Sequence, residues 1–250
     1  MTDISTEQKM RLFETIPDFI NWNVALNWIK EKQKFVSKII PKQILEEEVF
    51  SLEWHPSWHR EGTSFGLYPI EKWRKLVLAI YFADIVSYPH ITDQVAFERL
   101  LFVMHAFPQG FRTWWAKLSE EVWLPVGYSG WYPMLQTAFE LFKTNPEKIK
   151  DRTVVPHVSS QNQNPYLYFF NFSVAPPFKK TFLSKALMKN FVQDICSQTA
   201  AGLACITVSE DGERVARCFG MSKSGDFILS GQSEGVYIKT ERESVAVITI

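Results

Sequence analysis

Residues 166–187 read YLYFFNFSVAPPFKKTFLSKAL, and this stretch decides the fold. Its first half is a run of aromatic and apolar residues, which is typical of a β-strand. A short basic turn follows, and the apolar residues after it recur at helical spacing, which predicts a helix over 179–196. A strand, a turn and a helix in this order commonly bind a phosphate through the N–H groups of the first helical turn. Such a turn usually contains glycine, and this one contains none.

Further elements are predicted on both sides of this stretch. Upstream, TWWAKL and VWLPVGYSGWYPM are rich in aromatic and β-branched residues and predict two strands, followed by a short helix at 135–143. Downstream, GLACITVS predicts a strand, DGERVARCFG predicts a short helix, and FILSG, VYIKTE and VAVITI predict antiparallel strands. This order predicts an α+β fold with a mixed sheet flanked by helices.

The first part of the chain has a different pattern. Apolar residues at helical spacing predict helices within residues 1–50 and at about 70–86 and 93–106, whereas residues 54–69 contain Pro and Gly and predict an irregular segment. We therefore expect a mainly helical N-terminal extension over 1–106 and a second domain over 107–250. The two regions can equally share one core.

Composition and charge limit the functional class. The 250 residues contain 27 Lys and Arg and 27 Asp and Glu, so the net charge is zero. A nucleic-acid-binding protein normally has a basic excess, so that class is disfavoured. The N-terminus lacks the pattern of a signal peptide, and the apolar run at 76–86 is too short to span a membrane. With three cysteines and no CxxC spacing, the sequence predicts free thiols and a cytoplasmic protein.

Three segments together resemble the GNAT superfamily of N-acyltransferases. SVAPPFKKTFLSKALM is similar to the family's pyrophosphate-binding turn and the helix after it, and ACITVSEDGERVARCFGM is similar to its fifth strand and the short helix that ends in glycine. SKSGDFILSGQSEGVYIKT is similar to its final pair of strands. The resemblance covers roughly residues 110–240 and rests on the three motifs together.

The resemblance implies a donor substrate and a place for it. In this family an acyl-CoA lies between two parallel strands that separate, and an amine attacks its thioester carbonyl directly, without a covalent enzyme intermediate. By resemblance the donor is acetyl-CoA or a longer acyl-CoA, and no metal is expected. The residues that would bind the donor are Val174, Lys179, Lys180, Thr181, Phe182, Leu183 and Ser184.

The sequence departs from the family pattern at two motifs. Phe182 and Ser184 occupy positions where the family turn has glycines, which let the backbone approach the phosphates without a Cβ in the way. Lysines at 179, 180 and 185 supply positive charge that partly offsets this change. Ala216 stands where many members have a tyrosine that protonates the leaving thiolate. Thiolate leaves readily near neutral pH, so transfer does not require a strong acid.

Several residues are candidates for the acceptor side. An amine nucleophile must lose a proton, and Glu121 (or its neighbour Glu120) and His157 are candidate bases. Ser209 and Cys218 are candidate proton donors in place of the missing tyrosine, although both are common at strand ends and in cores. By resemblance, the aromatic strand would line the acceptor or acyl site, with cross-strand packing as the alternative. Its candidate substrate-binding residues are Tyr128, Trp131 and Tyr132.

The histidines do not predict a metal site. His55 and His59 are spaced as on one face of a helix, but Pro56 lies between them and no third ligand is evident. No G-x-S-x-G, G-x-G-x-x-G or Walker motif occurs, which disfavours a serine hydrolase and a nucleotide-binding enzyme.

Two functions from different classes fit these observations. The first is N-acyl transfer from an acyl-CoA or another acyl thioester to a small-molecule or peptide amine. The second is a catalytically degenerate GNAT-like domain that binds a ligand or partner, which the departures at Phe182 and Ala216 favour. A homodimer is compatible with either function.

Overall fold

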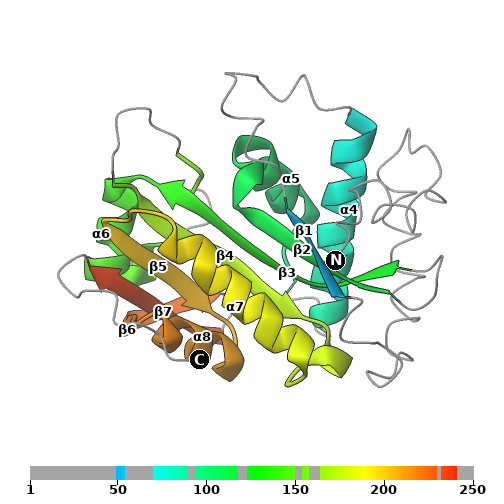
Figure 1. The fold of residues 1–250 in the computed structure, drawn as a ribbon. Helices are drawn as coiled ribbons and strands as arrows, with labels where there is room; N and C mark the ends of the chain where they lie inside the picture. Colours follow the sequence, from blue (N-terminus) through cyan, green and yellow to red (C-terminus); the bar gives the residue numbers. More distant parts are fainter. Residues whose placement is uncertain are drawn as a thin grey trace. The chain divides into compact units, whose positions relative to one another are not determined.

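The computed structural model describes residues 49–53, 70–88, 94–117, 123–149, 154–157, 164–229 and 232–240. Figure 1 shows the chain from β1 (blue) to β7 (red). The helices of more than one turn are α4 (Ile70–Ser87), α5 (Phe97–Ala106), α6 (Gln136–Thr144), α7 (Phe182–Cys196) and α8 (Glu210–Cys218). The short 3₁₀ turns are η6 (Pro108–Gly110), η7 (Pro146–Lys148) and η8 (Pro176–Phe178). The strands are β1 (Val49–Glu53), β2 (Phe111–Lys117), β3 (Trp123–Met134), β4 (Tyr166–Val174), β5 (Gly202–Thr207), β6 (Ser222–Leu229) and β7 (Gln232–Thr240).

The strands form one mixed sheet in the order β1-β2-β3-β4-β5-β7-β6. β1 pairs antiparallel with β2, β4 pairs parallel with β5, and β7 pairs antiparallel with both β5 and β6. The α+β class, the mixed sheet and the antiparallel pair β6–β7 are therefore confirmed. β1 is an unexpected strand, because Val49–Glu53 lies in the region that we expected to be mainly helical. Residues 1–48, 54–69 and 241–250, which include VAVITI, lie outside the described residues.

The chain divides into two compact units, and each is described by itself. The division passes through β3, β4 and α7, so each of these elements contributes residues to both units. The expected boundary between residues 106 and 107 stays a prediction.

The first unit holds β1, β2, α4, α5, β3 up to Ser129, Ser173 and Val174 of β4, and α7 up to Met188. Its helices form because the sequence has long apolar runs, and the middle of α4 is buried from Val77 to Ser87 except for Tyr81. The rings of Tyr81 and Phe97 meet edge to face at 4.9 Å and join α4 to α5.

The second unit has two aromatic clusters. In one, Phe169 of β4, Phe191 of α7 and Phe219 after α8 contact one another with ring centroids 4.8–5.3 Å apart. In the other, Phe139 and Phe142 of α6 pack on Tyr166 and Tyr168 of β4, at 4.5 and 5.6 Å. Because Tyr168 and Phe169 are successive residues of one strand, the clusters lie on opposite faces of the sheet. These seven aromatic residues therefore pack the described part of this unit on both faces of the sheet.

Candidate functional site

The candidate phosphate-binding turn lies between β4 and α7, in the first unit. Pro176 and Pro177 end the strand and form η8 with Phe178, because proline has no N–H for strand pairing. Lys180 then takes a left-handed backbone conformation with φ of 62°. This conformation is unfavourable for residues other than glycine and reverses the chain sharply. The helix α7 begins two residues later, at Phe182.

Much of the turn's backbone is already hydrogen-bonded within the turn. The N–H of Phe178 donates to the carbonyl of Ala175 at 2.9 Å, and the N–H of Thr181 donates to the carbonyl of Phe178 at 3.3 Å. The N–H of Lys179 donates to the carbonyl of Pro176 at 3.2 Å. The first N–H that closes the helix is that of Lys185, which donates to Thr181. Among the described residues, no acceptor is found for the N–H groups of Lys180, Phe182, Leu183 and Ser184.

The side chains of the predicted donor-binding residues take several roles. The Thr181 hydroxyl donates to the Phe178 carbonyl at 2.6 Å, and the Ser184 hydroxyl donates to the Thr181 carbonyl at 2.9 Å. Phe182 is half-buried. The remaining members divide into two exposed lysines, Lys179 and Lys180, and two buried apolar residues, Val174 and Leu183. Residues 179–184 therefore lie at the start of α7 and just before it, whereas Val174 ends β4, and their binding role stays a prediction.

Gly127 allows β3 to lie very close to the end of β4. A Cβ on Gly127 would stand 2.7 Å from the carbonyl oxygen of Ser173 and 3.3 Å from Cδ2 of Leu187. The N–H of Ala175 donates to the carbonyl of Val126 at 2.7 Å at the same place. This glycine is therefore required by close packing under the turn, within the first unit.

Tyr128, Trp131 and Tyr132 of β3 are buried, and their polar atoms form hydrogen bonds within the protein. The Trp131 Nε1 donates to Asp194 Oδ2 at 2.7 Å, and the Tyr132 hydroxyl donates to the carbonyl of Val154 at 3.0 Å. The Tyr132 ring packs against that of Tyr168 at 5.3 Å. The Tyr132 ring therefore makes a cross-strand packing contact, which was the alternative to lining the acceptor or acyl site. The substrate-binding role of Tyr128, Trp131 and Tyr132 stays a prediction.

Tyr128 has a partner that the sequence analysis did not consider. Its hydroxyl donates to Asp84 Oδ1 at 2.8 Å, and the N–H of Val95 donates to Asp84 Oδ2 at 2.8 Å. Asp84 and Tyr128 are both fully buried. Burial raises the pKa of Asp84 to about 7, against the two hydrogen bonds, which act to lower it. The sequence signal that could have identified Asp84 is that it is the single acidic residue in the apolar run LVLAIYFADIV.

The two parallel strands of the second unit are paired along only part of β4. The register runs from Tyr166 opposite Gly202 to Phe169 opposite Cys205, whereas β4 continues to Val174. In β4, the rings of Tyr168 and Phe170 both contact the Tyr132 ring, at 5.3 and 5.9 Å. This is expected, because every second side chain of a strand points to the same face of the sheet. Phe169 and Phe172 both contact the Phe191 ring, at 5.1 and 5.5 Å, although three positions separate them. The alternation therefore shifts by one residue after Phe170, as at a β-bulge, just beyond the last registered pair.

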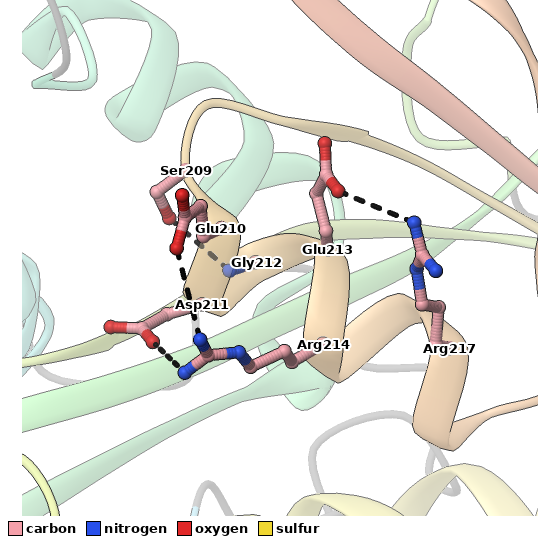
Figure 2. Close-up of polar contacts among 7 residues, drawn as sticks. All are labelled: Ser209, Glu210, Asp211, Gly212, Glu213, Arg214 and Arg217. Carbon is pink, nitrogen blue, oxygen red and sulfur yellow. Dashed lines mark hydrogen bonds and ion pairs between the residues drawn. The ribbon is translucent and has the colours of Figure 1, made fainter.

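The helix α8 follows β5 and is stabilised at both ends. Figure 2 shows the Ser209 hydroxyl accepting the N–H of Gly212 at 3.2 Å, which caps the first turn. Its exposed side carries Arg214 beside Glu210 and Asp211, and Arg217 beside Glu213 (Figure 2). At the other end the N–H of Met221 donates to Ala216 and that of Gly220 donates to Arg217, and Gly220 has a φ of 72°. This is a Schellman motif, and it requires the glycine on which the resemblance partly rests.

Several solved structures are similar to this chain. Ard1 from Thermoplasma volcanium has a TM-score of 0.46 and 11% identity over 77% of this chain and 97% of that chain. The loading GNATL domain of CurA from Lyngbya majuscula has a TM-score of 0.49 and 12% identity over 76% and 98%. Naa50 from Arabidopsis thaliana, solved with the bisubstrate analogue CoA-Ac-MVNAL, has a TM-score of 0.45 and 9% identity over 77% and 99%. No family model and no curated protein matches the sequence.

The order of elements that we expected in the second half is confirmed. The strand, basic turn and helix of 166–196 lead to the parallel strand β5, the short helix α8 and the antiparallel pair β6–β7, as the resemblance implies. The similarity concerns the fold, and the chemistry must come from this chain's own residues.

The three predicted catalytic residues lie in different parts of the chain. Glu121 lies outside the described residues. His157 is half-buried in the second unit, and its N–H donates to the carbonyl of Pro133 at 2.8 Å. Ser209 is exposed and caps α8. Ala216 is buried, with 1% of its surface exposed, so no phenol stands at that position. The catalytic roles of Glu121, His157 and Ser209 stay predictions.

Within the described ranges, none of the helices is both long enough and apolar enough to cross a bilayer. His55 and His59 fall outside those ranges, as does His90.

Proposed function

We propose that this protein is an N-acyltransferase that moves an acyl group from an acyl thioester to an amine. The observation that carries the proposal is the end of the β4–β5 register at Phe169 and Cys205, next to the shift in the side-chain alternation of β4. A flexible pantetheine arm can lie beside an extended strand and bond to its backbone, as peptides do when they add to a sheet edge. In this proposal the arm follows the last residues of β4 toward the turn.

The start of α7 would bind the phosphate of the donor. The N–H groups of Phe182, Leu183 and Ser184 lie in the first turn of a 15-residue helix, whose dipole favours an anion there. The exposed ammonium groups of Lys179 and Lys180 add positive charge beside them. Acetyl-CoA and longer acyl-CoA molecules have this phosphate and arm, and the acceptor would be a small-molecule or peptide amine. The free thiols of Cys196, Cys205 and Cys218 are consistent with a reducing, cytoplasmic location.

A binding module without catalysis is the second candidate function. It is favoured by the buried Ala216, which leaves no phenol at the position of the family's proton donor. It is also favoured by Phe182, whose ring stands at the first residue of α7 in place of a glycine. The first function predicts turnover of an acyl thioester, whereas a module that binds a ligand or partner predicts none.

A matched pair of variants at Ser184 tests the phosphate site. Ser184→Pro removes one N–H that the helix does not use, and proline is tolerated in a first helical turn. Ser184→Ala removes the hydroxyl but keeps the N–H. Calorimetric titration with CoA should show weaker binding by the proline variant and nearly unchanged binding by the alanine variant. Equal affinities for the two would exclude the N–H of residue 184 from the site.

Release of free thiol from acetyl-CoA in the presence of a panel of amines tests the reaction itself. Acceptor-dependent thiol release supports the transferase. Binding of CoA without thiol release from any acyl thioester supports the binding module instead.

A further inference from the structure

A buried carboxyl joins three segments of the first unit. Asp84 lies in α4, and its two oxygens accept hydrogen bonds from two different places in the chain. The Tyr128 hydroxyl of β3 donates to Oδ1 at 2.8 Å, and the N–H of Val95, just before α5, donates to Oδ2 at 2.8 Å. Asp84 and Tyr128 are both fully buried. One carboxyl thus holds β3 and the chain entering α5 against α4.

The charged and titratable groups near Asp84 come from the elements that pack on α4. Both α5 and β2 contact α4, and the charged side chains described on these two elements are Arg99 and Arg112. Arg99 lies over the Phe102 ring at 5.8 Å, and Nη1 of Arg112 donates to the carbonyl of Gln109 at 2.7 Å. The titratable neighbours described on α4, just after it and on β3 within this unit are Tyr81, Tyr88 and Tyr128.

The protonation of Asp84 changes near neutral pH. Burial raises the pKa of this carboxyl to about 7, because it outweighs the two hydrogen bonds, which act to lower it. Below this pH the carboxyl is neutral, and its burial costs little. Above it the carboxylate favours contact with water, because a buried charge is costly. Since both side chains of the Asp84–Tyr128 bond are fully buried, water reaches the carboxylate where the packing around this bond loosens.

The strand β3 is in direct backbone contact with the end of β4 in the same unit. Gly127, next to Tyr128, lies so close to β4 that a Cβ on it would stand 2.7 Å from the Ser173 carbonyl oxygen. One residue earlier, the carbonyl of Val126 accepts the N–H of Ala175 at 2.7 Å. Because these contacts join backbone atoms, β3 cannot shift at Tyr128 without changing them.

We propose that Asp84 is a pH-dependent positioning residue, which holds β3, and through it the end of β4, in place while its carboxyl is protonated. The consequence for acyl transfer rests on the proposed function, in which the donor's arm follows the last residues of β4. Asp84 exchanges its proton with solvent and takes no part in the bond changes of the transfer. Ionisation of Asp84 loosens its contact with Tyr128, so the donor's path becomes mobile and transfer slows above neutral pH.

Amide hydrogen exchange tests the link between Asp84 and β4 without any substrate. The probe is the N–H of Ala175, and its protection factor is measured by NMR at pH 5, 6, 7 and 8, with the intrinsic effect of pH removed. Opening that exposes Asp84 releases its proton, so the protection factor should fall by up to about tenfold per pH unit from pH 5 to pH 7 and then level off. In Asp84→Asn it should stay constant. The N–H of Asn145 in the second unit, which donates to Leu141, reports global unfolding.

The pH profile of thiol release from acetyl-CoA, with an amine that accepts the acyl group, tests the consequence for transfer. The kcat/KM of the unmodified protein divided by that of Asp84→Asn should fall by about tenfold between pH 6 and pH 8, following the neutral fraction of the carboxyl. This ratio cancels the deprotonation of the amine. The control Asp211→Asn makes the same chemical change at an exposed carboxyl of α8 and should keep the unmodified profile.

Tyr128→Phe breaks the same link from the other side. It removes a hydrogen bond that lowers the pKa of Asp84, so the inflection in the pH profile should move to higher pH. It also separates β3 from Asp84, so kcat should be lower at every pH. A rise in KM with the inflection unmoved would instead assign the Tyr128 hydroxyl to the substrate. Because the two substitutions are independent, one folded variant is sufficient for the test.

The outcomes separate this inference from the proposed function. The inference is wrong if the Ala175 protection factor has the same pH dependence in Asp84→Asn as in the unmodified protein, or if Ala175 and Asn145 respond equally. Turnover with parallel pH profiles in the unmodified protein and Asp84→Asn would also overturn it and leave the proposed function standing. The expected response at Ala175 without turnover of any acyl thioester would support the link between Asp84 and β4 and overturn the proposed function.

Discussion

The hydroxyl of Tyr128 donates a 2.8 Å hydrogen bond to the Asp84 carboxyl, and both side chains are fully buried. The bond joins β3 to α4, which are 44 positions apart at these residues. Because a buried charge is costly unless it is well solvated by the protein, the neutral form of Asp84 is favoured, and its pKa rises to about 7. The protonation of this carboxyl is therefore sensitive to pH near neutrality.

Asp84 should make the stability of the protein fall as the pH rises toward neutrality. The usual pKa of this carboxyl is 3.8, so from about pH 4 to about pH 7 the folded protein keeps a proton that the unfolded chain releases. Within this range the free energy of unfolding decreases by up to about 1.4 kcal/mol per pH unit, and above it the slope disappears. Urea unfolding at pH 5, 6, 7 and 8 should show this decrease.

The variant Asp84→Asn isolates this contribution from those of other carboxyls. Asparagine has a single acceptor oxygen, so it loses one of the two hydrogen bonds, which should cost about 1–2 kcal/mol at pH 5. It has no proton to lose, so the disadvantage should shrink or reverse by pH 8. Stability curves that stay parallel between pH 5 and pH 8 would show that Asp84 does not titrate in this range.

Gly127→Ala should destabilise the first unit strongly. The new Cβ would stand 2.7 Å from the backbone carbonyl oxygen of Ser173, which cannot move without displacing the end of β4. We expect a loss of about 2–3 kcal/mol in the free energy of unfolding, in the range of overpacked cores. Gly212→Ala is the control, because its Cβ would meet nothing closer than 3.4 Å and lies in the first turn of α8. Equal effects of the two changes would show that the close approach at Gly127 is not rigid.

Much of the second half could be predicted because its signals are local. The aromatic run predicts β4, the two prolines predict the turn at η8, and the helical spacing after Lys179 predicts α7. The predicted start of this helix differs from the observed one by a few residues. Three features depend on distant partners and were not predictable in this way. These are the pairing of β1 with β2, the bond between Tyr128 and Asp84, and the end of the β4–β5 register at Phe169. The close packing at Gly127 depends on distant residues as well, since its neighbours there are Ser173 and Leu187.

Lys180→Gly should separate stability from ligand binding at the turn. A non-glycine residue at φ of 62° is held at a cost of about 1 kcal/mol or more, which glycine would not have. The change should therefore raise the free energy of unfolding by roughly 0.5–1 kcal/mol, reduced by the greater entropy of glycine in the unfolded chain. It also removes an exposed ammonium beside the phosphate, so the affinity for CoA should fall. Thermal unfolding and calorimetric titration of the same sample measure both effects, and tighter CoA binding would contradict the assigned role of this lysine.

A substitution at Ser209 can separate helix capping from catalysis. Aspartate can cap the helix as serine does, but it cannot donate a proton. Its hydroxyl accepts the N–H of Gly212 and caps α8, whose first turn already contains Glu210, Asp211 and Glu213. Ser209→Ala should lower the free energy of unfolding by about 1 kcal/mol, whereas Ser209→Asp keeps a capping oxygen and should be close to neutral. Aspartate is ionised at neutral pH and has no proton to give to a leaving thiolate. We expect Ser209→Asp to retain thiol release from the preferred acyl thioester. Loss of turnover in this folded, capped variant would instead assign the Ser209 hydroxyl to the reaction as the proton donor that Ala216 cannot be.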